Sequence, residues 1–328
     1  MKISILGGGG FLGRKLAARL AADGNLGGHA IAALTLFDLA PPPPPATNFP
    51  VHCLGGDIAE LPAAAIPAGT DVVFHLAAVV SAAAEADYEL GRRVNVRGTD
   101  AVIDACRALA RPPRVVFTSS IASFSGGQSA ILGDDARQLP ANSYGAQKAA
   151  AELFLIDATR RGFLDAVCLR LPTVIVRPGR PNKAASSFFS AIVREPLLGL
   201  PADLPVGDDF AVWVSSPRSA LGWLLHAATM PTATLGLDRS INPPGISVRV
   251  GAIVAALETV RQGASHFIDR TPDPAIAAIV GGWPAGFDTA RARGLGFAAN
   301  EDLVTLVRSF VADDLAATRA DRDGIGLL

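Results

Sequence analysis

Four consecutive glycines, Gly7 to Gly10, stand close to the start of the chain and constrain its fold more than any other feature. A short apolar run precedes them, and a segment with helical periodicity follows. Glycines three residues apart allow a tight turn and a close approach of the backbone to a pyrophosphate at the positive N-terminus of the helix. A glycine run alone could be a flexible loop, but the strand and helix around it favour a dinucleotide site. We expect its cofactor-binding residues to be Gly7, Gly10, Phe11, Leu12 and Gly13.

Strand and helix patterns alternate through the first half of the chain. We expect strands at Lys2 to Leu6, Ala32 to Phe37, Val51 to Leu54, Val72 to Leu76, Arg114 to Thr118 and Ala166 to Arg170. We expect helices at Phe11 to Ala22, Val94 to Leu109 and Tyr144 to Arg161. Apolar strands that alternate with helices predict an α/β fold, a doubly wound parallel Rossmann sheet covered on both faces.

The regular alternation ends near Pro172, and prolines and glycines become frequent beyond it. We therefore expect residues 1–172 to form a dinucleotide-binding Rossmann domain. Residues 173–328 are expected to form mainly a smaller, irregular C-terminal substrate-binding domain, and residues 211–242 are expected to return to the first domain. With 328 residues, of which 50% are hydrophobic, the chain is long enough to bury the core that this division needs.

The charge balance excludes several classes of partner. The formal net charge is -1, so bulk attraction to nucleic acid or to an anionic membrane is not expected. The three cysteines are odd in number and widely spaced, which argues against a disulfide framework and against a metal site. No apolar stretch reaches membrane-spanning length, and the chain begins with a strand rather than a leader pattern. These features together predict a cytoplasmic protein.

Two acidic residues follow expected strands on the side where a dinucleotide would lie. Asp38 closes the second strand, where its carboxylate can accept hydrogen bonds from ribose hydroxyls and repel a ribose phosphate, so the sequence favours NAD over NADP. An Asp in this place can instead cap a turn. Asp57 follows the third strand, where a contact with the adenine amine and a turn role are about equally expected.

Tyr144 and Lys148 lie four residues apart in an expected helix, so their side chains project from one face. A free phenol has a pKa of about 10, and a nearby ammonium group is expected to lower it by stabilising the phenolate. Tyr144 can then take a hydroxyl proton while hydride leaves the carbon, and Lys148 is also placed to bond the nicotinamide ribose. Ser120 is our choice to orient the substrate oxygen, with Thr118 and Ser119 as alternatives at the same strand end.

Together these residues resemble an extended short-chain dehydrogenase/reductase, the group that includes the nucleotide-sugar epimerases and dehydratases. The resemblance covers nearly the whole chain. It rests on Gly7-x-x-Gly10-x-x-Gly13, Asp38, Asp57-Ile58, His75-Leu-Ala-Ala78, Asn95-Val-Arg-Gly-Thr99, Thr118-Ser-Ser120, Tyr144-x-x-x-Lys148 and Leu169-Arg-Leu-Pro-Thr173. The resemblance implies further contacts around the NAD at Ile58, Ala77, Ala78, Asn95, Pro172, Thr173 and Val174.

Within that group, residues 170–190 and the run Arg194-Glu-Pro-Leu197 are most similar to the D-erythronate dehydrogenases. This resemblance implies NAD-dependent oxidation of the 2-hydroxyl of a four-carbon sugar acid. The same segment is rich in cations and short polar side chains, which a small hydroxy acid needs for its carboxylate and its hydroxyls. We expect substrate contacts at Ser81, Ser120, Tyr144, Arg177, Asn182, Lys183 and Ser187, although any one of the last four could instead face solvent.

Two other functions compete with this reading. A sugar-nucleotide epimerase or dehydratase would hold its NAD through a closed cycle and release none. A dehydratase also needs an additional acid and base beside the catalytic tyrosine, whereas Ile121 and Ala122 follow Ser120 here. A non-catalytic NAD sensor would not need the set of Ser120, Tyr144 and Lys148.

The expected helices at 94–109 and 144–161 carry apolar residues over more than the face that covers a sheet. In the resembled family such helices pair across a twofold axis into a four-helix bundle. The resemblance therefore implies a homodimer.

Overall fold

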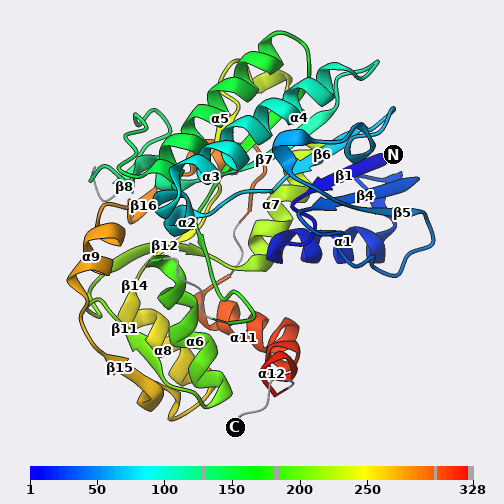
Figure 1. Cartoon of the computed structure of the whole chain (residues 1–328). Helices are drawn as coiled ribbons and strands as arrows, with labels where there is room; N and C mark the ends of the chain where they lie inside the picture. The colour runs from blue at the N-terminus through cyan, green and yellow to red at the C-terminus, as the bar shows by residue number, and fades with distance from the viewer. Residues whose placement is uncertain (128–130, 181–184, 299–300, 324–328) are drawn as a thin grey trace.

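The computed structural model describes residues 1–127, 131–180, 185–298 and 301–323. Its larger part is a seven-stranded parallel sheet with helices on both faces (Figure 1). From edge to edge the strands are β5 (Val51–Gly55), β4 (Ala33–Asp38), β1 (Lys2–Leu6), β6 (Val72–His75), β7 (Arg114–Ser120), β9 (Asp165–Leu171) and β13 (Ser240–Ile241). The six expected strands are all present, and the prediction of a doubly wound Rossmann sheet is confirmed.

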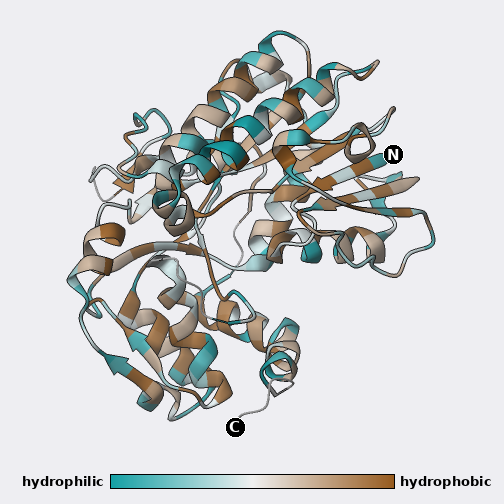
Figure 2. Cartoon of the chain, viewed as in Figure 1, coloured by the Kyte–Doolittle hydropathy of each residue, from teal (hydrophilic) through white to brown (hydrophobic). Residues whose placement is uncertain are grey.

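Alternate residues of the central strands bury opposite faces of the sheet. Ile3 and Ile5 belong to a core that includes α1 (Phe11–Asp23) and α7 (Pro217–Thr229). Leu6 and Val73 belong to the core on the other face, under α4 (Gly98–Arg107) and α5 (Ser143–Arg160). Because both faces are covered, the strands are hydrophobic along most of their length, as the brown central strands of Figure 2 show.

The helix that crosses from β6 to β7 begins earlier than the sequence pattern predicted. The expected segment from Val94 is preceded by α2 (Ser81–Ala86) and α3 (Tyr88–Arg92), and a π-helical turn, η3 (Arg93–Arg97), leads into α4. The path starts with α2 at Ser81, and Asp87 caps the next helix, α3, by accepting a hydrogen bond from the Leu90 N–H at 2.9 Å; apolar periodicity marks neither start.

A second layer of structure follows β9 and has its own core (Figure 1). A three-stranded sheet is formed by β10 (Thr173–Val174), β12 (Ala211–Ser215) and β14 (Ile246–Arg249), and a two-stranded one by β11 (Ala202–Leu204) and β15 (Ile268–Arg270). Its helices are α6 (Phe188–Leu198), α8 (Val250–Val260), α9 (Pro274–Gly281), α11 (Leu303–Asp313) and α12 (Leu315–Asp323).

Parts of the C-terminal half also pack on the larger sheet. Besides α7 and β13, Ala292 in α10 (Ala290–Gly294) belongs to the core beneath α1. The parallel pair of β8 (Ile131–Leu132) and β16 (Gly286–Phe287) joins the two halves directly, and β2 (Asn25–Leu26) with β3 (His29–Ala30) forms a short hairpin. In the described part of the chain, no helix is both long and apolar enough to cross a membrane.

Candidate functional site

A cavity of about 360 Å³ lies at the carboxyl ends of the central strands, where open parallel sheets bind their ligands. Of the residues singled out from the sequence, it is lined by Phe11, Leu12, Ala78, Ser81, Ser120, Tyr144, Lys148, Pro172, Thr173, Val174 and Arg177. The remaining wall consists of Leu76, Val80, Thr118, Ser119, Ile121, Ala122, Leu171, Ser186 and Trp283. Segments that are far apart in the sequence therefore meet around one small space.

The glycine turn has the shape that a pyrophosphate needs. Gly7 has a positive φ of +90°, and a Cβ there would lie 2.6 Å from the Ala77 nitrogen. Only glycine therefore fits where the turn after β1 meets the segment after β6. A Cβ on Gly13 would overlap the Gly7 carbonyl oxygen. Gly10 is the N-cap of α1 and no side chain caps this helix, so its first-turn N–H groups remain for an anion. These residues fit the diphosphate of NAD.

Asp38 ends β4 beside the glycine turn. Its Oδ2 accepts a hydrogen bond from the Gly9 N–H at 2.8 Å, and its Oδ1 accepts one from the Leu39 N–H at 2.7 Å. These two bonds fix the carboxylate next to the place where the adenosine ribose of a dinucleotide would lie, while each oxygen retains a lone pair. The position fits the role expected from the sequence.

We expect the protein to use NAD with a kcat/KM at least about a hundredfold above that with NADP, because the Asp38 carboxylate opposes a ribose phosphate of like charge. Asp38→Ser should lower the ratio of kcat/KM with NAD to kcat/KM with NADP. Asp23→Ser, at the other end of α1, should leave this ratio unchanged. Initial rates with both cofactors measure the ratio. Equal efficiencies in the unmodified protein would contradict the assignment of Asp38.

The catalytic candidates converge from β7 and the first turns of α5. Asn142 caps α5 by accepting a hydrogen bond from the Gly145 N–H at 2.8 Å, which fixes Tyr144 in the first turn. One turn later, the Lys148 Nζ donates a hydrogen bond to the Thr118 carbonyl at 2.7 Å. Ser120 is hydrogen-bonded with Tyr144. The structure therefore places Ser120, Tyr144 and Lys148 together.

The neighbours of Ser120 have other partners. The Thr118 hydroxyl donates to the His75 carbonyl at 3.3 Å, and the Ser119 hydroxyl donates to the Glu152 carboxylate. Of the three hydroxyls at this strand end, Ser120 is thus the one that the described structure directs to Tyr144.

The electrostatics of the pair differ from the expectation that Lys148 lowers the pKa of Tyr144. Burial raises the pKa of Tyr144 to about 12, while the hydrogen bond with Ser120 and the positive charge of Arg177 act to lower it. Burial also lowers the pKa of Lys148 to about 7, against the negative charge of Glu152, which raises it. The Lys148 amino group bonds the Thr118 carbonyl and lies 5.7 Å from the centre of the Tyr144 ring, and Arg177 is a second cation near the phenol, whose charge acts to lower the pKa of Tyr144.

Asn95 and Ala77 do not line the cavity; Ala77 lies against the glycine turn, where its N–H donates to the Leu6 carbonyl at 2.9 Å. Asn95 is 3% exposed, and its side-chain amide both donates to and accepts from the backbone of Val79, at 2.9 Å in each case. It therefore holds the segment between β6 and α2 in place, as a supporting residue would.

His75 is fully buried beside Thr99, and burial lowers its pKa to about 3, so it stays neutral as a packed histidine.

Asp57 and Ile58 lie away from the cavity lining. The Asp57 Oδ1 accepts a hydrogen bond from the Ala59 N–H at 2.8 Å, and its Oδ2 pairs with the Arg93 Nε at 2.6 Å. Asp57 thus has the bonds of a turn residue, and its contact with the adenine amine stays a prediction. Ile58 is buried against Gly98 at the start of α4.

Arg177 is partly buried in the cavity wall and is held from several sides. Its Nε donates to the Val174 carbonyl and its Nη2 to the Ser186 hydroxyl, each at 3.2 Å. Burial lowers the pKa of Arg177, and within the described ranges no Asp or Glu forms an ion pair with it. Ser186 lines the cavity, whereas Ser187 does not, and Asn182 and Lys183 lie outside the described residues.

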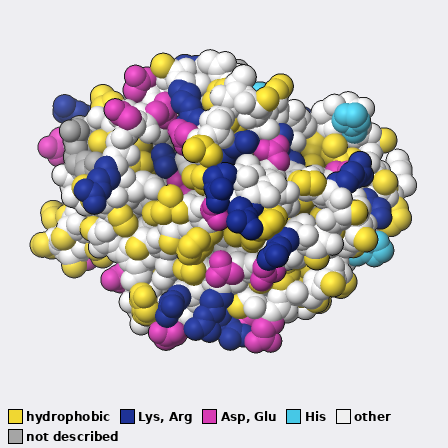
Figure 3. Space-filling model, turned by 90° about the horizontal axis from the view of Figure 1, so that it is seen from above, with side chains coloured by type: hydrophobic (Ala, Val, Ile, Leu, Met, Phe, Trp, Pro, Cys, Tyr) yellow, Lys and Arg dark blue, Asp and Glu magenta, His cyan; other side chains and the backbone are white. Residues whose placement is uncertain are grey.

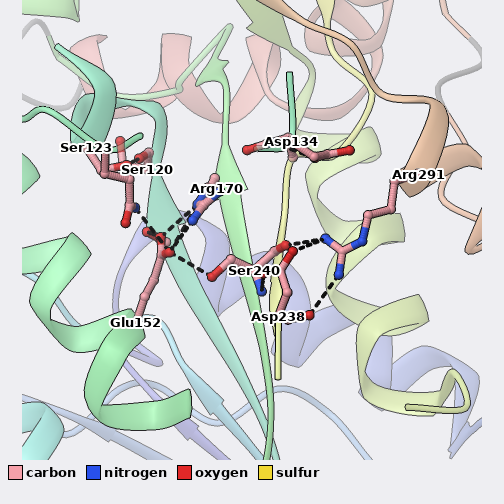
Figure 4. A network of polar contacts seen from close by, with 11 residues as sticks. Ser120, Ser123, Asp134, Glu152, Arg170, Asp238, Ser240 and Arg291 are labelled. Atoms are coloured by element: carbon pink, nitrogen blue, oxygen red, sulfur yellow. Dashed lines mark hydrogen bonds and ion pairs between the residues drawn. The ribbon is translucent and has the colours of Figure 1, made fainter. Parts of the chain in front are cut away.

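A buried ion pair behind the catalytic candidates was missed by the sequence reasoning. Glu152 is 1% exposed and accepts hydrogen bonds from Arg170 at 2.8 Å and from the Ser240 hydroxyl at 2.7 Å (Figure 4). It also accepts one from the Ser119 hydroxyl. Glu152 lies one turn beyond Lys148 on the same face of α5, so the spacing of four residues was an available signal. Its pairing with Arg170 and Ser240 depends on strand order and carried no local signal.

The cavity wall also contains Trp283, which no local pattern marked. It lies between α9 and β16, far along the chain from Tyr144. Sequence reasoning had no signal for it, because its position depends on how the C-terminal half packs on the first.

The comparisons with known proteins agree with this geometry. Residues 3–213 match the model of the NAD dependent epimerase/dehydratase family. The chain is 43% identical over 321 residues to a D-erythronate dehydrogenase of Cupriavidus necator, covering 95% of this chain and 98% of that protein. It is 38% identical over 322 residues to a D-erythronate dehydrogenase of Haemophilus influenzae, covering 96% of this chain and 100% of that protein.

A crystal structure described as a nucleoside-diphosphate-sugar epimerase from Agrobacterium tumefaciens superposes with a TM-score of 0.92 at 42% identity. The match covers 96% of this chain and 95% of that one. The family model spans more than half of the chain, and Phe11 and Leu12, which follow the glycine turn, line one cavity together with Ser120, Tyr144 and Lys148. The chain therefore belongs to the NAD-dependent epimerase/dehydratase family and is an oxidoreductase that uses NAD.

Proposed function

We propose that this protein oxidises the 2-hydroxyl of a small sugar acid, D-erythronate, to the 2-oxo acid, 2-dehydro-D-erythronate. The observation that carries the proposal is Arg177, a partly buried cation in the wall of the catalytic cavity with no Asp or Glu paired to it among the described residues. A buried charge needs a partner, and a carboxylate bound in the cavity would provide one. The two D-erythronate dehydrogenases that match almost the full chain support this substrate.

The chemistry assigned to the residues is as follows. Ser120 donates a hydrogen bond to the substrate oxygen and orients it toward Tyr144. The Tyr144 phenolate accepts the proton of the 2-hydroxyl while the C2–H bond breaks and a C=O bond forms. NAD, when bound, accepts the hydride. The positive charge of Arg177 favours the phenolate and holds the substrate carboxylate, and Lys148 is placed to bond the nicotinamide ribose.

The proposal predicts that the purified protein forms NADH when D-erythronate and NAD are mixed, and hardly any when a UDP-sugar replaces the acid. Absorbance of NADH at saturating NAD measures both rates. NADH release with UDP-sugars but none with hydroxy acids would overturn the substrate assignment.

The second candidate is a sugar-nucleotide epimerase or dehydratase with tightly held NAD. The description of the similar Agrobacterium structure favours it. The residues around Tyr144 do not, because Ile121 and Ala122 are buried apolar residues at the place next to Ser120 where a dehydratase needs an additional acid and base. The same assay separates the two candidates.

We also propose a homodimer formed through the outer helices of the larger part. On α5, Leu153 is 63% exposed and Phe154 is 43% exposed, because both lie on the face that points away from the sheet. Figure 3, which looks down on the molecule from above, shows hydrophobic side chains gathered across the centre of this view. Exposed apolar residues on a helix surface are typical of a subunit contact. We propose a cytoplasmic location for the protein, and its three free cysteines fit that reducing compartment.

A further inference from the structure

The run Arg194-Glu-Pro-Leu197, part of the resemblance to the D-erythronate dehydrogenases, lies in α6 and is buried. Arg194 is 1% exposed and Glu195 is 4% exposed, and their side chains form an ion pair at 2.8 Å. Neither residue lines the catalytic cavity. Apolar side chains of similar volume often stabilise a core as well as a buried ion pair does. Stability alone therefore does not account for this pair.

The backbone of Arg177 is bonded to α6 at both of its polar groups. Its N–H donates a hydrogen bond to the Ser190 hydroxyl at 3.1 Å, and its carbonyl accepts one from the Arg194 Nη1 at 2.7 Å. Ser190 and Arg194 are four residues apart, so they lie on one face of the helix, and both are buried. The main chain of Arg177 is thus held by two side chains from consecutive turns of one helix.

The helix α12 holds the same segment from near the end of the described chain. The Arg322 Nη2 donates to the Gly179 carbonyl at 3.3 Å and to the Glu195 carboxylate at 2.8 Å. Glu195 therefore lies between two guanidinium groups, those of Arg194 and Arg322. Each of these groups also bonds a backbone carbonyl of the segment that carries Arg177.

These contacts bear on where the Arg177 guanidinium lies. From the fixed backbone its side chain reaches the cavity wall, where its Nε and Nη2 are bonded to Val174 and Ser186. Its positive charge also acts on the Tyr144 phenol. A contact between a guanidinium and a carboxylate depends on orientation, and a misplacement of about 1 Å in a site can lower a rate a hundredfold. Whatever fixes the Arg177 backbone therefore sets the strength of this contact.

We propose that Arg194 and Ser190 are positioning residues, which fix the backbone of Arg177 from α6 so that its guanidinium meets the carboxylate of the substrate. Glu195 and Arg322 hold Arg194 in place for this purpose. The inference rests on the proposed function, in which Arg177 binds the carboxylate of a small sugar acid. It extends the substrate site to three residues outside the cavity lining and to the C-terminal helix.

The first test is the affinity for substrate of an Arg194→Met variant. This change removes the donor to the Arg177 carbonyl, while Glu195 keeps its bond with Arg322, so no buried carboxylate is left without a partner. Titration calorimetry of D-erythronate into protein saturated with NADH, which cannot react, measures binding apart from turnover. The Kd should rise by about fivefold to fiftyfold, the range expected for a weakened charged hydrogen bond.

Arg114→Met is the matched control. Arg114 begins β7, at the end of the strand away from Ser120, and donates to the Ala227 carbonyl at 2.6 Å. Its carboxylate partner Asp165 keeps a second arginine, Arg239, at 2.8 Å. The control thus loses the same kinds of bond as Arg194→Met, but at a distance from the cavity, and its Kd for D-erythronate should be unchanged.

A double-variant cycle separates positioning from a general loss of stability. If Arg194 acts through Arg177, Arg194→Met should lower kcat/KM for D-erythronate by about fivefold to fiftyfold in the unmodified protein, but by less than about twofold in an Arg177→Met background. Ser190→Ala removes the other backbone bond with a smaller change in volume, so it provides the test if Arg194→Met fails to fold. It should lower kcat/KM by about threefold to tenfold, with the same dependence on Arg177.

The possible outcomes distinguish this inference from the proposed function. Unchanged affinity in both Arg194→Met and Ser190→Ala would overturn the inference alone. So would a loss of kcat/KM that is as large in the Arg177→Met background as in the unmodified protein, or an equal loss of affinity in Arg114→Met. An unmodified protein that neither oxidises nor binds D-erythronate would overturn the proposed function, and the inference with it.

Discussion

Tyr144→Phe is expected to lower kcat by about 10²- to 10⁴-fold, because the variant retains the ring and loses the group that accepts the substrate proton. Binding of NADH should change little, since the glycine turn and Asp38 are untouched. Initial rates with D-erythronate and a fluorescence titration with NADH measure the two effects. Tyr88→Phe is the matched control, because Tyr88 is the other tyrosine of the chain and is 57% exposed on α3.

The pH profile gives a second view of the same group. The base form of Tyr144 must be deprotonated, and burial raises its pKa to about 12, so the rate should increase with pH through the alkaline range. The residual rate of Tyr144→Phe should lack this increase. A variant with near-normal kcat, or one that keeps the alkaline increase, would show that another residue takes the proton.

Glu152→Ala is expected to lower the free energy of unfolding by about 3–5 kcal/mol, because it leaves the buried Arg170 guanidinium without its carboxylate. The Ser119 and Ser240 hydroxyls lose an acceptor at the same time. Chemical denaturation followed by circular dichroism measures the loss. Figure 4 shows why the effect should be large: donors from several elements converge on this one carboxylate.

An exposed ion pair provides the control for this prediction. Glu60 is 74% exposed at its side chain and pairs with Arg93 at 2.7 Å, so Glu60→Ala should cost no more than about 1 kcal/mol. If Glu152→Ala lowers the free energy of unfolding by no more than Glu60→Ala does, then the buried pair does not stabilise the junction of α5, β9 and β13. Partial recovery in a Glu152→Ala/Arg170→Met double variant would identify the unpaired guanidinium as the main cost.

Local patterns were sufficient where neighbours in sequence are neighbours in space. The glycine turn, the strands and the pair of Tyr144 and Lys148 follow from periods of two, three and four residues, so the fold class and the meeting of Tyr144 and Lys148 at one cavity could be predicted. The helical crossover was predicted with a late start, because neither the start of α2 at Ser81 nor the Asp87 cap of α3 is marked by apolar spacing.

The sequence failed where the outcome depends on burial or on long-range packing. Adjacency of a lysine suggested a lower pKa for Tyr144, but the loss of water around the phenol outweighs nearby charge. The partners of Glu152 come from β9 and β13, whose order in the sheet no local pattern specifies. Trp283 reaches the cavity only because Gly282 can touch Ser125.

The pairing of β8 with β16 has an evolutionary consequence. The residues assigned to proton transfer lie on the Rossmann scaffold, whereas the Trp283 wall comes from a short segment bounded by α9 and β16. Mutations in that segment can alter the wall without moving the glycine turn or α5. Part of the cavity wall and the residues proposed for proton transfer are thus encoded in separate stretches of the gene, so one can vary while the other is inherited unchanged.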